Sequence, residues 1–250
     1  IRLEGCTFSE AICRLGQNVS GNTAHSYSSP KRGISISPNQ IENVMASGTR
    51  RLTSISDTLP HLQEYLKKER CIDLEKATPF LKCISYEVRG RRYEAIGFTN
   101  SSGGYELRDN NTFKGTVAPK DITPIFEDME QPVCLFEGFM DFLSFLSMKK
   151  EITSVCLVMN SVSNVARSIH YLNKRNITSV RAFLDNDDTG RKAVQEFVNA
   201  GFKVEDMAVY YKDFKDLNEF HVSRVREQQK KLEKTPNTSN KRKQVKLKIR

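Results

Sequence analysis

Residues 132–148 read PVCLFEGFMDFLSFLSM. The short apolar run Val133 to Phe136 has the length of a buried strand, and Phe139 to Met148 then repeats apolar side chains at helical spacing. Gly138 stands between the two patterns and permits a sharp turn of the chain. Glu137 therefore marks the carboxyl end of the strand. The stretch predicts a strand–turn–helix unit that presents a carboxylate at its turn.

The same order of strand and helix repeats three more times towards the C-terminus. Strand-like runs cover 155–159, 180–184 and 207–211, and helical patterns cover 163–172, 189–200 and 217 onward. Such alternation predicts an α/β domain, a parallel sheet flanked by helices in the Rossmann-like manner. In sheets of this kind a ligand binds at the carboxyl ends of the strands.

Acidic residues gather at these predicted strand ends. Asp141 follows Glu137 by about one helical turn, and Asp185 and Asp187 lie two residues apart on an extended segment, so that both face the same side. Asp216 follows the last strand-like run. Carboxylates without His or Cys suit Mg²⁺ or Mn²⁺ better than zinc. Taken singly, each group also has a structural interpretation, because Asp and Glu cap and favour helix N-termini.

The first half of the chain has a different pattern. Helical periodicity over 61–70 and 74–81 precedes strand-like runs over 83–88, 92–98 and 105–108, with a hairpin turn at 89–91. We expect a small α+β unit over 58–128 and the α/β domain over 129–222. The Ser-, Asn-, Gly- and Pro-rich residues 18–57 are expected to form a linker, and residues 1–17 a short amphipathic helix.

Composition limits the class of protein. The chain has 250 residues, 38% of them hydrophobic, and no apolar run long enough to span a membrane. No leader opens the sequence, although it starts at Ile1, so a missing N-terminal piece remains open. The 6 cysteines contain no C-x-x-C pair, which disfavours a zinc ribbon within this chain and suits a reducing compartment. We therefore expect a cytoplasmic protein without a membrane partner.

Charge is concentrated at the C-terminus. Residues 224–250 contain 11 Lys and Arg and 2 Glu, which accounts for the whole formal net charge of +9. A basic tail over 223–250 can bind nucleic acid by counterion release. It can equally be a solvated terminal helix, and the charge pattern does not separate these two interpretations.

The acidic motifs resemble those of the Toprim domain, the catalytic module shared by topoisomerases and bacterial-type primases. Glu137 and the pair Asp185-x-Asp187 correspond to the family's signature glutamate and D-x-D. Residues 137–141 have the primase form E-G-x-x-D, and 185–190 are similar to D-x-D-x-A-G. Residues 215–219 resemble K-D-P-D-E, with Leu217 and Asn218 as departures.

The resemblance continues upstream, which separates primases from topoisomerases and Toprim nucleases. Residues 65–72 look like the primase element Y-L-x-x-R-G-I, and 95–115 are similar to the subdomain before Toprim in primase-like proteins of bacterial mobile elements. This likeness implies a path for template or nucleotide lined by Arg89, Arg91, Arg92, Arg108 and Lys114; except for Lys114, ordinary exposed charges explain them as well. Residues 1–17 resemble the last helix of a zinc-binding domain whose ligands would lie before this chain.

The resemblance implies DNA primase activity, that is, nucleotidyl transfer on a single-stranded DNA template in DNA replication. Glu137, Asp185 and Asp187 would be catalytic, and the metal ligands would be Glu137, Asp141, Asp185, Asp187 and Asp216. Lys114, Ser161 and Lys215 would contact the nucleoside triphosphate, although Ser161 is equally explained as a helix cap. A replicative helicase or plasmid mobilisation proteins are expected partners. A Toprim-type metal-dependent nuclease and a non-catalytic DNA-binding module remain alternatives.

Overall fold

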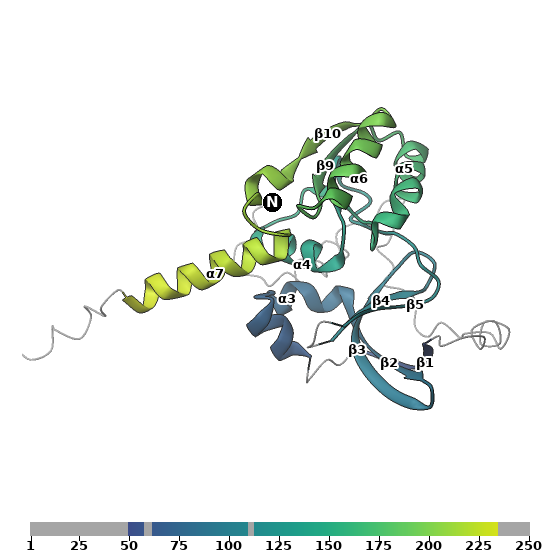
Figure 1. The fold of residues 1–250 in the computed structure, drawn as a ribbon, viewed down its shortest axis with the longest axis vertical. Helices are drawn as coiled ribbons and strands as arrows, with labels where there is room; N and C mark the ends of the chain where they lie inside the picture. The colour runs from purple at the N-terminus through teal and green to yellow at the C-terminus, as the bar shows by residue number, and fades with distance from the viewer. Residues whose placement is uncertain (1–49, 58–61, 110–112, 235–250) are drawn as a thin grey trace, which may run out of the picture.

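The computed structural model describes residues 50–57, 62–109 and 113–234. Within these ranges the chain forms two five-stranded sheets, one in the first half and one in the second (Figure 1). The expected helix over 1–17, the linker up to residue 49 and the tail beyond residue 234 lie outside the described residues. Their assignment stays a prediction.

The first sheet is antiparallel throughout, in the order β1-β2-β3-β4-β5. Its strands are β1 Arg51–Ser56, β2 Leu81–Val88, β3 Arg91–Thr99, β4 Tyr105–Arg108 and β5 Lys114–Val117. Arg89 and Gly90 join β2 to β3 with φ values of 50° and 78°. Positive φ at both central positions is the geometry of a type I′ hairpin turn, which confirms the expected hairpin.

Short helical segments pack beside this sheet. They are the π-helical turn η1 Tyr65–Glu69, helix α3 Leu74–Ala77 and the 3-10 turn η2 Thr78–Phe80. The apolar side chains Leu62, Tyr65 and Leu66 are buried in the same cluster as Phe98 of β3 and Phe139 of the second half. The first unit therefore shares a core with the second one.

Strand β1 corrects one expectation, because residues 51–56 were assigned to the linker. They pair with β2 instead, and Arg51 Nη2 lies 2.5 Å from Glu87 Oε2 of its partner strand. An edge strand with mostly exposed side chains carries no apolar alternation, so its sequence resembles a loop. Strands β5 and β6, only four and three residues long, were missed for a similar reason.

The second sheet has the order β10-β9-β7-β8-β6. Strands β7 to β10 are mutually parallel, and the short β6 is antiparallel to β8. The strands are β6 Thr123–Ile125, β7 Glu130–Phe136, β8 Ser154–Val158, β9 Ser179–Phe183 and β10 Lys203–Asp206. The helices are α4 Phe139–Met148, α5 Val165–Lys174, α6 Asp188–Asn199 and α7 Leu217–Lys234, with 3-10 turns η3 Val162–Asn164 and η4 Met207–Tyr211.

Alternate residues of this sheet face two separate cores. Cys134 and Phe136 of β7 pack with the aromatic side of α4, whereas Val133 and Leu135 pack with α5 and α6. This two-residue period places helices on both faces of the sheet, as Figure 1 shows. The expected architecture, helices around a parallel-containing sheet, is confirmed.

The prediction of a last strand over 207–211 is wrong. Those residues form the 3-10 turn η4, and the strand β10 lies just before it over the polar residues 203–206. Asp206 accepts a hydrogen bond from the Ala208 N–H (2.9 Å) and so caps the turn. Tyr211 then turns its side chain into the core. Only Tyr211 of this apolar run is buried, whereas Val209 and Tyr210 are exposed, so the run marks neither a strand nor a buried segment.

Helix α7 begins at the sheet and extends away from the body of the molecule (Figure 1). Its first residues, Leu217 and Asn218, are buried, whereas residues from Arg226 onward are exposed. The portion of the basic segment that the structure describes is thus an extension of a packed helix. Among the described residues no helix has the length and apolarity needed to cross a bilayer.

Candidate functional site

A cleft of about 520 Å³ lies where the first unit meets the carboxyl ends of the parallel strands. One wall carries acidic groups of the second half, and the other carries cationic groups of the first. The acidic residues of the second half are Glu137, Asp141, Asp185 and Asp216, and the cationic residues of the first are Arg50, Arg70, Arg108, Lys114 and Lys120. The buried Glu106 of β4 also lines the cleft on the first unit's side. The cleft therefore places negative and positive charge opposite each other.

Parallel pairing of β7 and β9 brings two of the carboxylates together. Phe136 lies opposite Phe183 in the sheet, so both chains leave the sheet at the same edge. The Asp185 backbone N–H donates to Glu137 Oε2 at 3.4 Å. Gly190 permits this arrangement, since a Cβ at that position would lie 2.1 Å from the Asp185 carbonyl oxygen. Helix α6 can start this close to the site only with glycine there.

Two further carboxylates come from helices. Asp141 lies in the first turn of α4, is 7% exposed, and accepts a hydrogen bond from the Asn218 backbone N–H at 3.2 Å. Asp216 caps the start of α7 by accepting from the Glu219 N–H at 2.8 Å. In the described part of the chain, no three carboxylate, imidazole or thiol groups are close enough to form a ready metal site. The carboxylates line the cleft but do not converge on a single position for a metal ion.

Burial and mutual repulsion make the carboxyl groups of Glu137, Asp141 and Asp185 hard to ionise. Burial, followed by the charge of Asp185, raises the pKa of Glu137 to about 7. Burial and the charge of Asp216 raise the pKa of Asp185 to about 6, and the same two causes raise that of Asp141 well above its usual range. Each group would ionise more readily beside a cation.

The donor chemistry fits a hard divalent cation. Every candidate ligand is a carboxylate, and the cleft contains no His or Cys. Oxygen donors of this kind suit Mg²⁺ or Mn²⁺. A bound cation would also relieve the repulsion that raises the pKa values of Glu137 and Asp185. We therefore keep Glu137, Asp141, Asp185 and Asp216 as the residues that would hold it.

Most of the arginines of the opposite wall are held by contacts within the protein. Arg108 stacks over the Phe139 ring, with its guanidinium carbon 5.3 Å from the ring centroid, and donates to the Leu107 carbonyl at 2.8 Å. Burial lowers the pKa of Arg108 from its usual value. Arg70 donates to the Tyr65 hydroxyl at 2.7 Å and to Asn218 at 3.0 Å. These arginines form a fixed cationic surface.

Most of the predicted site residues line the cleft, and two do not. Glu137, Asp141, Asp185, Asp216, Lys114 and Ser161 all line the cleft. Asp187 and Lys215 are not among the described residues of its lining. Asp187 instead caps α6 by accepting from the Thr189 and Gly190 N–H groups, both at 2.9 Å.

Ser161 both lines the cleft and caps η3 through a bond from the Ser163 N–H at 3.2 Å. The cap is thus observed, and the contact with a triphosphate stays a prediction. Of the predicted template-path arginines, Arg108 lies in the cleft. Arg89, Arg91 and Arg92 lie exposed at the far end of the β2–β3 hairpin, outside the lining of the cleft.

Sequence reasoning missed several polar lining residues, among them Arg50, Glu106, Lys120, Asn160 and Asn218. Asn218 was noted only as a departure from an acidic motif, and Arg50 lay in the supposed linker. Lys120 and Asn160 carry no motif, although each follows a region whose strand was expected or missed. The one signal in the sequence is that Lys120 and Asn160 each lie in a connection just after a strand.

Comparison with known proteins follows this division of the chain. Residues 134–221 match the family model described as Toprim-like. Residues 52–118 match a family model described only as a domain of unknown function. No curated protein matches the chain. The expected fold class is thereby confirmed: a small α+β unit is followed along the chain by a Toprim-like α/β region.

One solved structure is similar over most of its length. It is the crystal structure of the primase fragment of the bacteriophage T7 primase-helicase protein, with 17% sequence identity and a TM-score of 0.47. The similarity covers 65% of this chain and 70% of that chain.

Proposed function

We propose that this protein is a primase-like nucleotidyltransferase, which makes short oligonucleotides on single-stranded DNA with Mg²⁺ or Mn²⁺. The observation that carries the proposal is the cleft in which carboxylates of the Toprim-like region face cations of the preceding unit. Template and nucleotide are both polyanions, so the cationic wall suits them. The carboxylates suit the metal ions that accompany phosphates.

Glu137, Asp185, Asp141 and Asp216 would hold the cations. Such ions, when bound, draw a nucleotide 3′-hydroxyl towards the α-phosphate of the next nucleotide. The chain's own groups do the rest. Glu137 would instead accept the proton of the hydroxyl if the cations are held by the other carboxylates. Lys114, exposed in the cleft, would contact the triphosphate.

The proposal includes two residues that do not line the cleft. Asp187 and Lys215 would join the site only by turning from their present positions, and we keep them as proposed ligand and phosphate contact. A helicase or mobilisation partner, a cytoplasmic location, a mobile-element origin and a preceding zinc-binding domain also remain predictions. The cytoplasmic location rests on composition and the cysteine pattern, and the others rest on the sequence resemblance.

A nuclease would use the same carboxylates on a water molecule. The participation of Lys114, Arg108 and Arg70 from the first unit favours nucleotide binding, because a nuclease centre needs only the Toprim-like region. A non-catalytic DNA-binding module would need the cations and not the carboxylates. The three functions therefore differ in what they require of Asp185 and of added nucleotides.

The test is a denaturing gel of products formed on single-stranded DNA with ribonucleotides or deoxyribonucleotides and Mn²⁺. The parent is compared with Asp185→Ala and with Asp128→Ala, an exposed aspartate just before β7 and thus at the opposite end of the sheet. Nucleotide-dependent oligomers that only Asp185→Ala loses support the proposal. Shortened template without nucleotides supports the nuclease, and equal DNA binding by all three proteins without products supports the binding module.

A further inference from the structure

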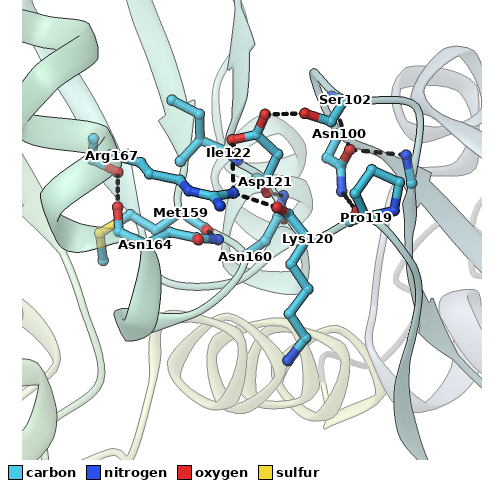
Figure 2. Close-up of polar contacts among 12 residues, drawn as sticks. Asn100, Ser102, Pro119, Lys120, Asp121, Ile122, Met159, Asn160, Asn164 and Arg167 are labelled. Carbon is cyan, nitrogen blue, oxygen red and sulfur yellow. Dashed lines mark hydrogen bonds and ion pairs between the residues drawn. The ribbon is translucent and has the colours of Figure 1, made fainter. Parts of the chain in front are cut away.

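The connection between β5 and β6 is tied to the first unit on one side. Asn100 Nδ2 donates to the Pro119 carbonyl at 2.8 Å, and Ser102 Oγ donates to Asp121 Oδ2 at 2.5 Å (Figure 2). A Cβ on Gly104 would lie 1.9 Å from the same Pro119 oxygen. The connection therefore packs directly against the loop that follows β3.

The second unit holds the same connection from the other side. Arg167 Nη1 donates to the Lys120 carbonyl and lies 3.5 Å from Asp121 Oδ1. Asn160 Nδ2 donates to the Asp121 carbonyl at 2.8 Å and to Thr123 Oγ1 at 2.9 Å. Backbone oxygens on either side of Lys120, and its own, are thus all hydrogen-bonded. The position of its Cα is fixed relative to both walls of the cleft.

This arrangement is held at a cost to stability. Both bonds of Asn160 use its amide nitrogen, which leaves its Oδ1 atom buried without a hydrogen-bond partner among the described residues. A buried unpaired carbonyl oxygen destabilises the folded state. Destabilising features of this kind are found mainly at functional sites, where they position a functional group.

The Lys120 side chain is not part of this network. It is exposed, lines the cleft, and has no ion-pair or hydrogen-bond partner for its ammonium group among the described residues. Figure 2 shows it extending away from the network, with no contact drawn at its end. Arg70 and Arg108, by contrast, donate to protein groups. Lys120 thus combines a fixed backbone with an ammonium group that forms no ion pair or hydrogen bond among the described residues. Its charge acts on the buried Glu106 carboxyl group, where it opposes the rise in pKa that burial causes.

We infer that Lys120 is a phosphate contact of the cleft, and that Arg167 is its positioning residue. A lysine ammonium is a compact point charge that binds a phosphate without strict geometry. Anchoring its backbone reduces the freedom that binding must remove. The phosphate is that of the single-stranded DNA backbone or of a nucleoside triphosphate. The inference rests on the proposed function in naming these ligands.

The test measures binding in EDTA, so that it needs no catalysis. Fluorescence anisotropy of a labelled single-stranded oligonucleotide is recorded over a series of salt concentrations, and a fluorescent ribonucleoside triphosphate is titrated in parallel. The proteins are the parent, Lys120→Ala, Lys120→Arg and the control Lys174→Ala, an exposed lysine at the C-terminal end of α5.

For a DNA contact, Lys120→Ala weakens oligonucleotide binding about 3- to 10-fold and lowers the slope of log K against log salt by about 0.7. For a triphosphate contact, the nucleotide titration weakens instead. Lys120→Arg retains the parental value in either case, and Lys174→Ala changes neither. Unchanged binding of both ligands by Lys120→Ala overturns the inference.

A double-mutant cycle tests Arg167. If Arg167 acts through Lys120, Arg167→Ala weakens binding in the parent and has no further effect in Lys120→Ala. Equal effects in both backgrounds would make Arg167 an independent contact and overturn its positioning role.

Failure of this inference is distinct from failure of the proposed function. If the parent makes primers and Lys120→Ala binds both ligands normally, only the inference about Lys120 fails. If the parent binds neither ligand in EDTA and also makes no oligomers with Mn²⁺, both the inference and the proposed function fail.

Discussion

Arg70 and Asn218, 148 residues apart, hydrogen-bond to each other in both directions. Arg70 Nη1 donates to Asn218 Oδ1 at 3.0 Å, and Asn218 Nδ2 donates back to the Arg70 carbonyl at 3.1 Å. Asn218 Nδ2 also donates to Ser144 Oγ at 2.8 Å, and its backbone N–H donates to Asp141. One amide thus joins the first unit, α4 and α7 beside the cleft. An aspartate at this position could accept from Arg70 but could not donate to its carbonyl.

Asn218→Ala is expected to lower the free energy of unfolding by about 1–3 kcal/mol, because it leaves the buried partners of the amide unpaired. Asn218→Asp should also destabilise, since it removes both amide donors and adds a carboxyl group near Asp141. Urea denaturation measures both. The control Asn173→Ala, at an exposed position of α5, should stay within about 0.5 kcal/mol of the parent. Equal stability of Asn218→Ala and Asn173→Ala would contradict the role of this amide.

Gly190→Ala is expected to destabilise by about 1–3 kcal/mol and to disturb the Asp185 loop, because the new Cβ would meet the Asp185 carbonyl at 2.1 Å. The matched control is Gly138→Ser. Its Cβ would meet nothing closer than Asp141 Oδ2 at 3.7 Å, and its hydroxyl can cap α4. Thermal denaturation compares the two variants. Similar melting temperatures would show that the close approach of α6 to Asp185 is not needed.

Glu137→Gln should stabilise the cation-free protein at high pH. The folded-state pKa of Glu137, about 7, exceeds its value of about 4.5 in the unfolded chain. The stability that this group contributes is therefore complete below about pH 4.5 and is lost as pH rises through 7. Glutamine avoids that loss, so the variant should gain about 1–2 kcal/mol at pH 8, an amount already reduced for partial solvent screening.

Urea denaturation in EDTA at several pH values checks this expectation. The gain should grow between pH 5 and pH 8. Glu196→Gln, an exposed glutamate of α6, should show no such trend. A gain at pH 8 no larger than that at pH 5 would count against the burial of an ionised Glu137.

Asp216 caps α7 and is proposed as a metal ligand, and substitution can separate the observed role from the proposed one. Asparagine retains the cap of α7, so Asp216→Asn should keep parental stability, whereas Asp216→Ala should lose about 1 kcal/mol. Both variants remove the carboxylate and should reduce the rise in melting temperature that Mn²⁺ causes. A full Mn²⁺ response in Asp216→Asn would leave Asp216 as a cap alone.

Much of the second half could be predicted from the sequence. The bounds of α4 agree with the expected ones, and the acidic residues lie at the carboxyl ends of β7 and β9 as expected. In the first half, the bounds of β4 also agree. These features depend on short-range patterns: an apolar run, a turn residue and a helical period within a few residues. The sequence resemblance to Toprim motifs rested on the same local spacing.

Other elements could not be read in this way. β1 and β10 are edge strands whose pairing depends on a neighbour distant in the chain. The apolar run of η4 forms a turn that buries only Tyr211. Tertiary contacts decide such segments, because their local pattern does not distinguish strand from loop.

The sequence by itself determined which carboxylates stand at the strand ends and that their chemistry suits a hard cation. Only the tertiary structure decided that Asp187 turns to cap α6 while Asp216 enters the cleft. It also placed Lys120 and Arg70 opposite the carboxylates. Those positions depend on hydrogen bonds such as Arg70 to Asn218, between residues whose separation in sequence gives no periodic signal.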